Sequence, residues 1–381
     1  MKVKNSKFKI QSSKSKLTLT HQHEVTNSEA HQQRSSSTAK LINSEAHQQR
    51  SSPTAKLTNT KSSTAKLTNS ETHQHEVSNS EAHQHEAHQH EVIMQIIDGK
   101  KIAAEIKAEI ANEVKAMIDK GEAAPHLAAV IVGDDGAAQT YVDSIKKNCQ
   151  TVGFTSSIYH FPADIKEEEF LKAIDFLNDD VDIDGYIIQL PLPKHISNDK
   201  VVEHVDPAKD MDCFHPSNMG NLLLGKDCYP PATPMGTMEL IRRSGIETEG
   251  KNCVVLGRSN IVGKPLAMML TQKDANATVT ICHSKTKNLK KVCAKADILF
   301  VAIGQAEMIT ADYIKKDAVV VDIGIHRIED PESEKGYRIC GDVDHNDVAG
   351  KCSAITPVPG GVGSMTMACL LMNTLKARKK K

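Results

Sequence analysis

Several features that would assign the chain to a compartment or a class are missing from its 381 residues. The formal net charge is only −1, so composition provides no general attraction to nucleic acid or to an anionic membrane. No apolar run is long enough to span a bilayer, and no secretory signal is recognisable. The nine cysteines contain no C-x-x-C pair, which argues against a disulfide framework and a structural zinc site. We therefore expect a cytoplasmic protein with no bound metal and with neither nucleic-acid nor membrane partners.

Glycine is absent from residues 1–93, and all 21 glycines follow Met94. This early segment is also repetitive, because NSEAHQQRSSSTAKLI (27–42) is followed directly by NSEAHQQRSSPTAKLT (43–58). The repeat is shorter than the units of common solenoids, and its apolar content could not bury a core. We predict that residues 1–93 form a disordered, low-complexity tail.

Two functional interpretations of this tail are open. Ten of the 18 histidines lie in it, several as H-Q-H, and histidine-rich tracts can bind metal, although repetition alone explains them. Its first twenty residues are basic and rich in serine, as transit peptides are, but they have no apolar face at helical spacing. The simplest interpretation is that Met94 is the functional start and the tail is upstream sequence.

The rest of the chain alternates between predicted strands and helices. Apolar residues repeat every four positions from Ile102 to Ile118, which predicts an amphipathic helix that ends at Gly121. Apolar strands that alternate with helices predict an α/β fold with a parallel sheet covered on both faces. The predicted elements of the first half are the strand HLAAVIVG (126–133), a helix at 138–152, the strand SSIYHF, a helix at 165–178 and the strand GYIIQLPLP.

The second half repeats this pattern after a proline-rich stretch, 207–235, that we predict to be mostly loop. It resembles a nucleotide-binding α/β unit, and a final helix at about 365–378 is expected to pack against the first domain. The strands predicted here are NCVVLG (252–257), ATVTICH, DILFVAIG and AVVVDIGI, with a helix that starts at Gly263.

The stretch VVLGRSNIVGKP (254–265) combines a strand, a glycine turn and the start of a helix. Gly257 and Gly263 would let the backbone approach a pyrophosphate, for which the helix N-terminus supplies amide donors. The spacing differs from G-x-G-x-x-G, so an ordinary strand–helix turn is the alternative. The guanidinium of Arg258 suits a 2′-phosphate and hence NADP. Ser284, after the next strand, falls where an adenosine-ribose contact would lie.

Three further stretches carry candidate ligand-binding groups. TPVPGGVGSMT (356–366) is a glycine-rich loop that could place bare backbone against a flat ligand, or could simply link two domains. Gln189 in IIQLPLP ends a buried strand at the edge of the sheet where ligands bind in this architecture. Asp210 and Asp212 in DPAKDMDCFHP lie on a loop, where lone carboxylates are usually solvated.

In this order, these stretches resemble the bifunctional methylenetetrahydrofolate dehydrogenase / methenyltetrahydrofolate cyclohydrolase family. The resemblance covers residues 94–381 and also includes IIDGKKIA, TYV and ATVTICHSKT. It implies oxidation of 5,10-methylenetetrahydrofolate with NADP (NAD being possible), then hydrolysis to 10-formyltetrahydrofolate, in a homodimer. It also implies a folate-binding catalytic domain at 94–236, completed by 364–381, and a Rossmann-like NADP-binding domain at 237–363.

The resemblance also implies roles for individual residues. Tyr141 would stack on the folate, Asp212 would hold the pterin, and Gln189 would lie beside the catalytic lysine and tune it. The remaining contacts implied are Pro359, Gly360 and Gly363 on the folate side, and Gly257, Arg258, Ser259, Ser284 and Ile325 on the NADP side, with Thr366 nearby.

The catalytic lysine is where this sequence departs from the family. The family places it four residues after the tyrosine, one helical turn along the same face, and that position here is Ile145. Lys146 lies about 100° further round the helix, so it could replace the lysine only by swinging its stem. The cyclohydrolase step is therefore in doubt. A folate- or nucleotide-binding protein without catalysis is the alternative, against which the intact GRSNIVG and PGGVG loops argue.

Two smaller departures accompany it. Cys213 and Ser364 stand where the family usually has glycine and proline. A cysteine in a glycine position is expected to strain the loop beside Asp212.

Overall fold

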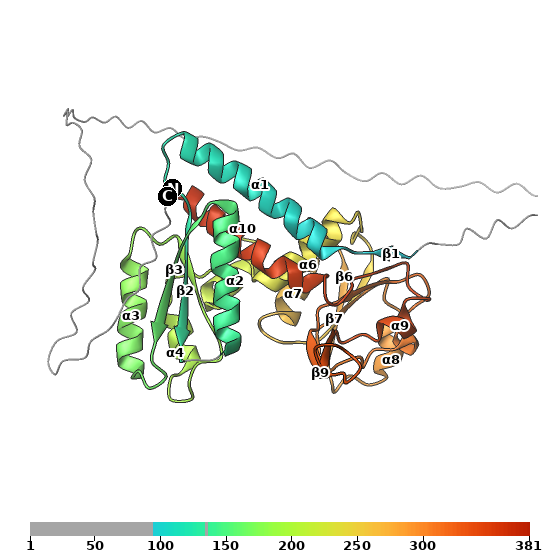
Figure 1. Ribbon diagram of the computed structural model, residues 1–381. Coiled ribbons are helices and arrows are strands. Elements are labelled where there is room, and N and C mark those ends of the chain that lie inside the picture. The colour runs from blue at the N-terminus through green and yellow to red at the C-terminus, as the bar shows by residue number, and fades with distance from the viewer. Residues whose placement is uncertain (1–93, 134–135) are drawn as a thin grey trace, which may run out of the picture. The chain divides into compact units, whose positions relative to one another are not determined.

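The computed structural model describes residues 94–133 and 136–381, and of residues 136–139 it describes the backbone alone. The predicted disorder of 1–93 lies outside the described residues. Within them, strands and helices alternate as the sequence predicts, and the fold is α/β (Figure 1).

A three-stranded parallel sheet in the order β3-β2-β4 forms the first part of the fold. Its central strand is apolar on both faces, as expected for a sheet that is covered on both sides. Leu127 and Ala129 belong to one core cluster with α1 and α2, whereas Ala128 and Val130 belong to another with α3. The elements are α1 (Gly99–Asp119), β2 (His126–Val132), α2 (Gly136–Val152), β3 (Thr155–Phe161), α3 (Glu167–Asp179) and β4 (Gly185–Ile188).

A six-stranded parallel sheet in the order β1-β11-β8-β7-β5-β6 forms the second part. Because β5 lies between β6 and β7, the chain runs first to one side of β5 and then to the other. In open α/β sheets, ligands bind at such a switch point, outside the carboxyl ends of the strands. The strands are β1 (Gln95–Ile96), β5 (Asn252–Leu256), β6 (Thr278–Cys282), β7 (Ile298–Val301), β8 (Val319–Asp322) and β11 (Ala354–Ile355).

Short elements connect these strands. A two-stranded antiparallel ribbon, β9-β10, follows β8. The strand β1 pairs with β11 of the large sheet, although it lies at the start of the stretch 94–236 that we predicted to form the first domain. The connecting elements are α7 (Gly263–Leu270), α8 (Leu289–Cys293), the 3₁₀ helix η1 (Ala311–Tyr313), β9 (His326–Glu329), β10 (Tyr337–Cys340) and α9 (His345–Val348).

The proline-rich stretch 207–235 is more helical than predicted. It contains α5 (Pro216–Leu223) and the start of α6 (Ala232–Arg243), and α4 (Asn198–His204) precedes it. Pro216 occupies the first turn of α5, and Pro231 immediately precedes α6. Proline is favoured at such positions because the first amides of a helix have no intrahelical acceptor. These prolines therefore mark helix starts rather than loop.

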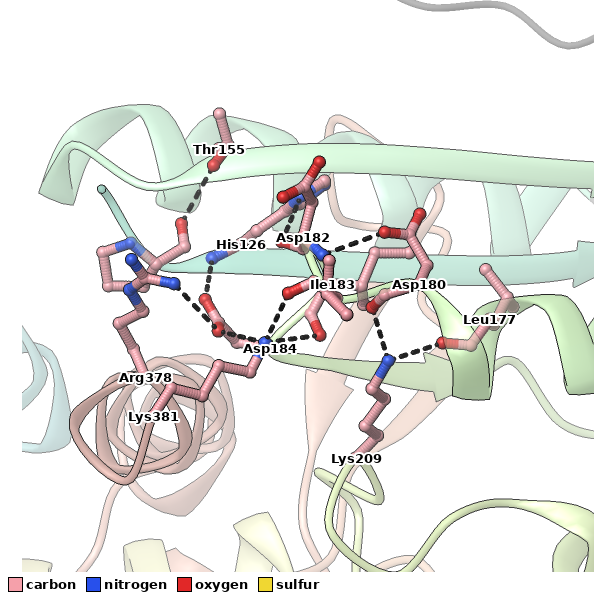
Figure 2. A network of polar contacts seen from close by, with 12 residues as sticks. His126, Thr155, Leu177, Asp180, Asp182, Ile183, Asp184, Lys209, Arg378 and Lys381 are labelled. Atoms are coloured by element: carbon pink, nitrogen blue, oxygen red, sulfur yellow. Dashed lines mark hydrogen bonds and ion pairs between the residues drawn. The ribbon is translucent and has the colours of Figure 1, made fainter. Parts of the chain in front are cut away.

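The last helix, α10 (Met365–Lys379), follows a 3₁₀ turn, η2 (Val362–Ser364), and packs against α1, α6 and β2 (Figure 1). This confirms the prediction that the C-terminal helix contacts the first domain. The buried Asn373 amide donates to the carbonyl oxygens of Met211 and Pro230 at 3.0 and 2.8 Å. Near the end of the helix, Arg378 and Lys381 reach the carboxylate of Asp184 (Figure 2).

All nine cysteines lie in the described part of the chain, where they are buried and unpaired. None of the helices among residues 94–133 and 136–381 is both long enough and apolar enough to cross a membrane.

Candidate active site

The turn between β5 and α7 brings bare backbone to the switch point of the large sheet. Gly257 has a φ of 132°, and a Cβ there would collide with the carbonyl oxygen of Ala302 after β7. A Cβ on Gly263 would collide with the carbonyl oxygen of Gly257. The Ser259 hydroxyl accepts from the amides of Val262 and Gly263 at 3.1 and 3.3 Å, so Ser259 shapes the turn. Only glycine at both positions permits this close approach.

Cationic and polar side chains surround this turn. Arg258 is exposed within the turn, directly after Gly257, and Ser284 is exposed after the neighbouring strand β6. The Gly257 amide donates to the Cys282 carbonyl oxygen at 2.9 Å, which holds the two strand ends together. The residues after β6 are His283, Ser284 and Lys285, so no carboxylate occupies the place where one would bind an unmodified ribose.

Ile325 and Thr366 occupy different environments. Ile325 is 64 % exposed on the loop after β8, at the carboxyl edge of the large sheet. Thr366 is half-buried in the first turn of α10, and its Oγ1 lies 3.3 Å from Oγ1 of Thr233 in α6.

The loop PGGVG is shaped by the start of α1. Gly360 has a φ of 117°, and its carbonyl oxygen accepts from the Lys100 amide at 3.0 Å. A Cβ on Gly99 would collide with the carbonyl oxygen of Gly361. Pro359 and Gly363 remain exposed on this loop. Gly99 thus also shapes the PGGVG loop, although the sequence did not single it out. The sequence signal for it is its place beside the α1 N-cap in IIDGKKIA.

Tyr141 in α2 and Asp212 after β4 come close enough to interact electrostatically. Burial, aided by the Asp212 carboxylate, raises the pKa of the Tyr141 hydroxyl. Burial, aided by Asp210, raises the pKa of Asp212 to about 7. Asp212 also lines a cavity of about 20 Å³ with Ile188 and Leu190, the residues on either side of Gln189. The structure therefore brings Tyr141, Asp212 and the end of β4 together.

The two aspartates of the loop differ in role. Asp210 is buried and accepts from the amides of Phe214 and His215 at 3.1 and 2.9 Å and from Asn218 Nδ2 at 3.0 Å. Its carboxylate is thus used to shape the loop, whereas the Asp212 carboxylate accepts no hydrogen bond within the described part of the chain. Cys213 adopts a φ of 58°, a left-handed conformation that costs a side chain about 1–2 kcal/mol. The expected strain beside Asp212 is present.

Gln189 is half-buried at the end of β4. Its backbone amide donates to the Val130 carbonyl oxygen and its side-chain amide to the Leu190 carbonyl oxygen, both at 2.9 Å. Its side-chain oxygen accepts no hydrogen bond among the described residues.

Ile145, one helical turn after Tyr141, is fully buried. It belongs to the apolar cluster that also contains Val142 and Cys149, and Tyr141 packs against that cluster. Lys146 is half-buried and Lys147 is exposed. The helix position one turn after Tyr141 therefore holds a hydrocarbon that can neither donate nor accept a proton.

Taken together, the doubly wound sheet, its glycine turn at the switch point and the separate three-stranded domain define a two-domain α/β protein of the dinucleotide-binding class. Comparisons with known proteins make this specific. Residues 97–212 match the family model described as tetrahydrofolate dehydrogenase/cyclohydrolase, catalytic domain. Residues 231–381 match the one described as tetrahydrofolate dehydrogenase/cyclohydrolase, NAD(P)-binding domain.

Individual relatives agree. The bifunctional protein FolD of Phocaeicola vulgatus is 52 % identical over 289 residues, which are 75 % of this chain and 99 % of the relative. The bifunctional protein FolD of Cytophaga hutchinsonii is 54 % identical over 286 residues, which are 74 % of this chain and 99 % of the relative. The crystal structure of the bifunctional FolD enzyme of Campylobacter jejuni superposes with a TM-score of 0.71 at 44 % identity, covering 75 % of this chain and 99 % of that one.

The structure of a Trypanosoma brucei methylenetetrahydrofolate dehydrogenase-cyclohydrolase, complexed with NADP cofactor and inhibitor, has a TM-score of 0.70 at 35 % identity and covers 75 % of this chain and 98 % of that one. The chain belongs to the tetrahydrofolate dehydrogenase/cyclohydrolase family, which confirms the resemblance seen in the sequence.

Proposed function

We propose that this chain oxidises 5,10-methylenetetrahydrofolate to 5,10-methenyltetrahydrofolate in one-carbon metabolism. The observation that carries the proposal is the glycine turn of Gly257 and Gly263 at the switch point, in a chain whose relatives are named as bifunctional FolD proteins. Dinucleotide binding needs this turn, whereas a folate-binding protein without catalysis has no use for it.

NADP is the dinucleotide that the charged residues favour. The exposed guanidinium of Arg258 and the exposed Ser284-Lys285 pair would flank the adenosine ribose of a bound dinucleotide. The residues directly after β6 include no carboxylate, which would repel a 2′-phosphate. The Trypanosoma brucei relative, which was solved with NADP, supports the same choice. Arg258, Ser259 and the α7 amides would hold the phosphates, and Ile325 would contact the far end of the cofactor.

The chemistry of the first step is a hydride transfer from the one-carbon bridge, and the bound nicotinamide supplies the acceptor. The protein therefore acts mainly by alignment. Tyr141 would stack against the folate, and the Asp212 carboxylate would accept hydrogen bonds from the pterin. Pro359, Gly360 and Gly363 would allow a flat ligand to lie against the backbone, with the loop held by α1.

The second step, addition of water to the methenyl carbon and ring opening, needs a group that carries a proton between the added hydroxyl and the ring nitrogen. Ile145 cannot do so, and Lys146 starts about 100° away round the helix. Gln189 can position such a group but cannot replace it. We therefore expect the methenyl compound to hydrolyse at close to its uncatalysed rate.

One assay tests both steps. The purified full-length chain is mixed with 5,10-methylenetetrahydrofolate and NADP, and the appearance and decay of the methenyl chromophore are followed against a buffer blank. We expect accumulation, with decay no faster than in buffer. Decay well above the blank would remove the doubt about the cyclohydrolase. No reduction of either NADP or NAD would overturn the proposed function and favour a binding protein without catalysis.

We further propose a cytoplasmic homodimer, with the folate-binding domain at 94–236 plus 364–381 and the NADP-binding domain at 237–363. In support of self-association, β6 pairs only with β5 among the described strands, and Ile281 is exposed on it. An unpaired edge strand of this kind can pair with a strand of a second chain. Sedimentation of the purified chain tests this, and a monomer at micromolar concentration would contradict it.

A further inference from the structure

A buried carboxylate outside the predicted site organises the edge of the large sheet. Asp342, which lies between β10 and α9, is 0 % exposed. It accepts from three successive backbone amides of the loop after β7: Oδ2 from Ile303 at 2.7 Å and Gly304 at 3.2 Å, and Oδ1 from Gln305 at 2.8 Å. Hydrogen bonds to an ionised acceptor are among the stronger ones in proteins. The loop 303–305 is therefore held to one side chain.

The same carboxylate also holds the loop after β8. Nε2 of His326 lies 2.8 Å from Asp342 Oδ1, and because a carboxylate only accepts, this nitrogen carries the hydrogen. His326 directly follows the exposed Ile325. Gly324 directly precedes Ile325, and a Cβ on Gly324 would collide with the carboxyl carbon of Asp342. The loop that carries Ile325 therefore packs against the Asp342 side chain. The residue after Ile325, His326, is hydrogen-bonded to the same side chain.

A second carboxylate fixes Asp342 itself. Asp322, buried at the end of β8, accepts from the amides of Asp342 and Val343, both at 3.0 Å. It also accepts from Gly324 at 3.0 Å, and a Cβ on Gly341 would collide with its Oδ2. Since the Asp342 backbone cannot shift without breaking these bonds, its side chain is a fixed anchor for both loops.

The anchored loops adjoin the dinucleotide turn. Ala302, which precedes the first amide bound by Asp342, is the residue whose carbonyl oxygen lies against Gly257. The amide of Ala302 is bonded to the Leu256 carbonyl oxygen at 2.8 Å. Asp342 therefore connects the glycine turn of β5, the loop after β7 and the loop carrying Ile325 into one unit.

We propose that Asp342 and His326 are positioning residues for the dinucleotide, which set the loop that carries Ile325 at the distance at which the cofactor contacts it. The inference rests on the proposed function, because it assumes that a dinucleotide occupies the switch point. Neither side chain touches the reacting atoms. Both act through the backbone of 303–305 and 323–325. Their loss should consequently weaken dinucleotide binding and leave folate binding alone.

His326 offers the cleaner test, since its side chain is 20 % exposed and its loss leaves Asp342 with three amide donors. His326→Ala should raise the dissociation constant for NADP, measured by calorimetry, and the KM for NADP by about tenfold, as expected for a displaced binding loop. His326→Gln can still donate to Asp342 and should return both values to near those of the unaltered chain. The KM for the folate substrate should stay unchanged in both.

Lys290→Ala provides a matched control. Lys290 forms an ion pair with Asp312 at 2.9 Å, in which both side chains are largely exposed, and it lies on the same domain. It should leave NADP binding unchanged. If His326→Ala and His326→Gln behave alike, or if the folate KM rises as much as that for NADP, the positioning role is overturned. Retained NADP binding without turnover in the unaltered chain would overturn the proposed function alone, whereas no NADP binding at all would overturn both.

Discussion

The Lys381 ammonium lies 2.8 Å from Oδ1 of Asp184, so the residues after α10 are tied to the residue that precedes β4 (Figure 2). The Asp184 side chain is 0 % exposed, and its Oδ2 accepts from the His126 amide at 2.8 Å. Lys381 also donates to the carbonyl oxygens of Val181 and Ile183 at 2.8 and 3.1 Å. Segments from three parts of the chain therefore meet at one buried carboxylate.

Asp184→Ala should accordingly destabilise the fold. It removes the acceptor of the part-buried His126 amide, and a buried donor left without a partner typically costs about 1–3 kcal/mol. Urea denaturation followed by circular dichroism gives the free energy of unfolding. Asp119→Ala is the control, because Asp119 pairs with Lys115 at 2.6 Å in the open and such pairs contribute less than about 1 kcal/mol. Equal effects in the two variants would contradict the importance of Asp184.

Ile145→Lys should create or raise cyclohydrolase activity. It restores a proton-carrying group one turn after Tyr141, and a positioned acid or base contributes on the order of 10²–10⁴ in rate. The decay rate of the methenyl compound measures this. Because Ile145 is fully buried, the variant should also be less stable than the unaltered chain.

Lys146→Ala and Lys147→Ala are the matched controls for that variant. Neither should change methenyl decay if Lys146 does not reach the site. A loss of hydrolysis confined to Lys146→Ala would show that Lys146 is the proton carrier after all.

The pH dependence of folate use should follow Asp212. Burial raises the pKa of this carboxyl from an ordinary 3.8 to about 7, so it is protonated in a growing fraction of molecules as pH falls below 7. A protonated carboxyl accepts hydrogen bonds from the pterin less well. We therefore expect kcat/KM for the folate substrate to be constant well above pH 7 and to decrease below pH 7, with a slope that approaches about tenfold per pH unit.

Asp212→Asn should give a lower kcat/KM without that inflection, since an amide does not titrate in this range. Asp164→Asn serves as a control, because Asp164 is exposed on a different loop. An inflection that survives in Asp212→Asn would assign the titration to another group.

Gly263→Ala should disrupt the dinucleotide turn. The added Cβ would collide with the Gly257 carbonyl oxygen and would displace the start of α7. Because a small displacement of a binding turn can cost about a hundredfold, we expect NADP affinity to fall by at least tenfold in calorimetry.

Gly220→Ala is the counterpart of this variant. Gly220 lies within α5, and a Cβ there would meet nothing within 4 Å. Alanine is the better helix former, so this variant should be stabilised by up to about 1 kcal/mol and should bind NADP normally. Similar losses in both variants would mean that the effect is not specific to the turn.

Much of this protein could be read from its sequence, because continuous apolar runs bounded by glycine leave few alternatives to buried parallel strands. The strand HLAAVIVG and the final helix lie where they were predicted. Ile145 could also be recognised as a departure, since the spacing of residues along a helix depends only on helical geometry. The helices in 207–235 were missed because a proline that starts a helix looks locally like one that interrupts it.

Tertiary structure alone decided which carboxylates matter for shape. In the sequence, Asp210 and Asp342 look like ordinary loop residues and Asp322 like part of a strand. Only the backbone amides that converge on them from distant segments reveal them as anchors. The approach of Gly99 to the PGGVG loop is of the same kind. Local sequence thus determined the elements and the chemistry each could offer. Contacts between segments far apart in the chain, which no local pattern encodes, decided how the loops are held to form a site.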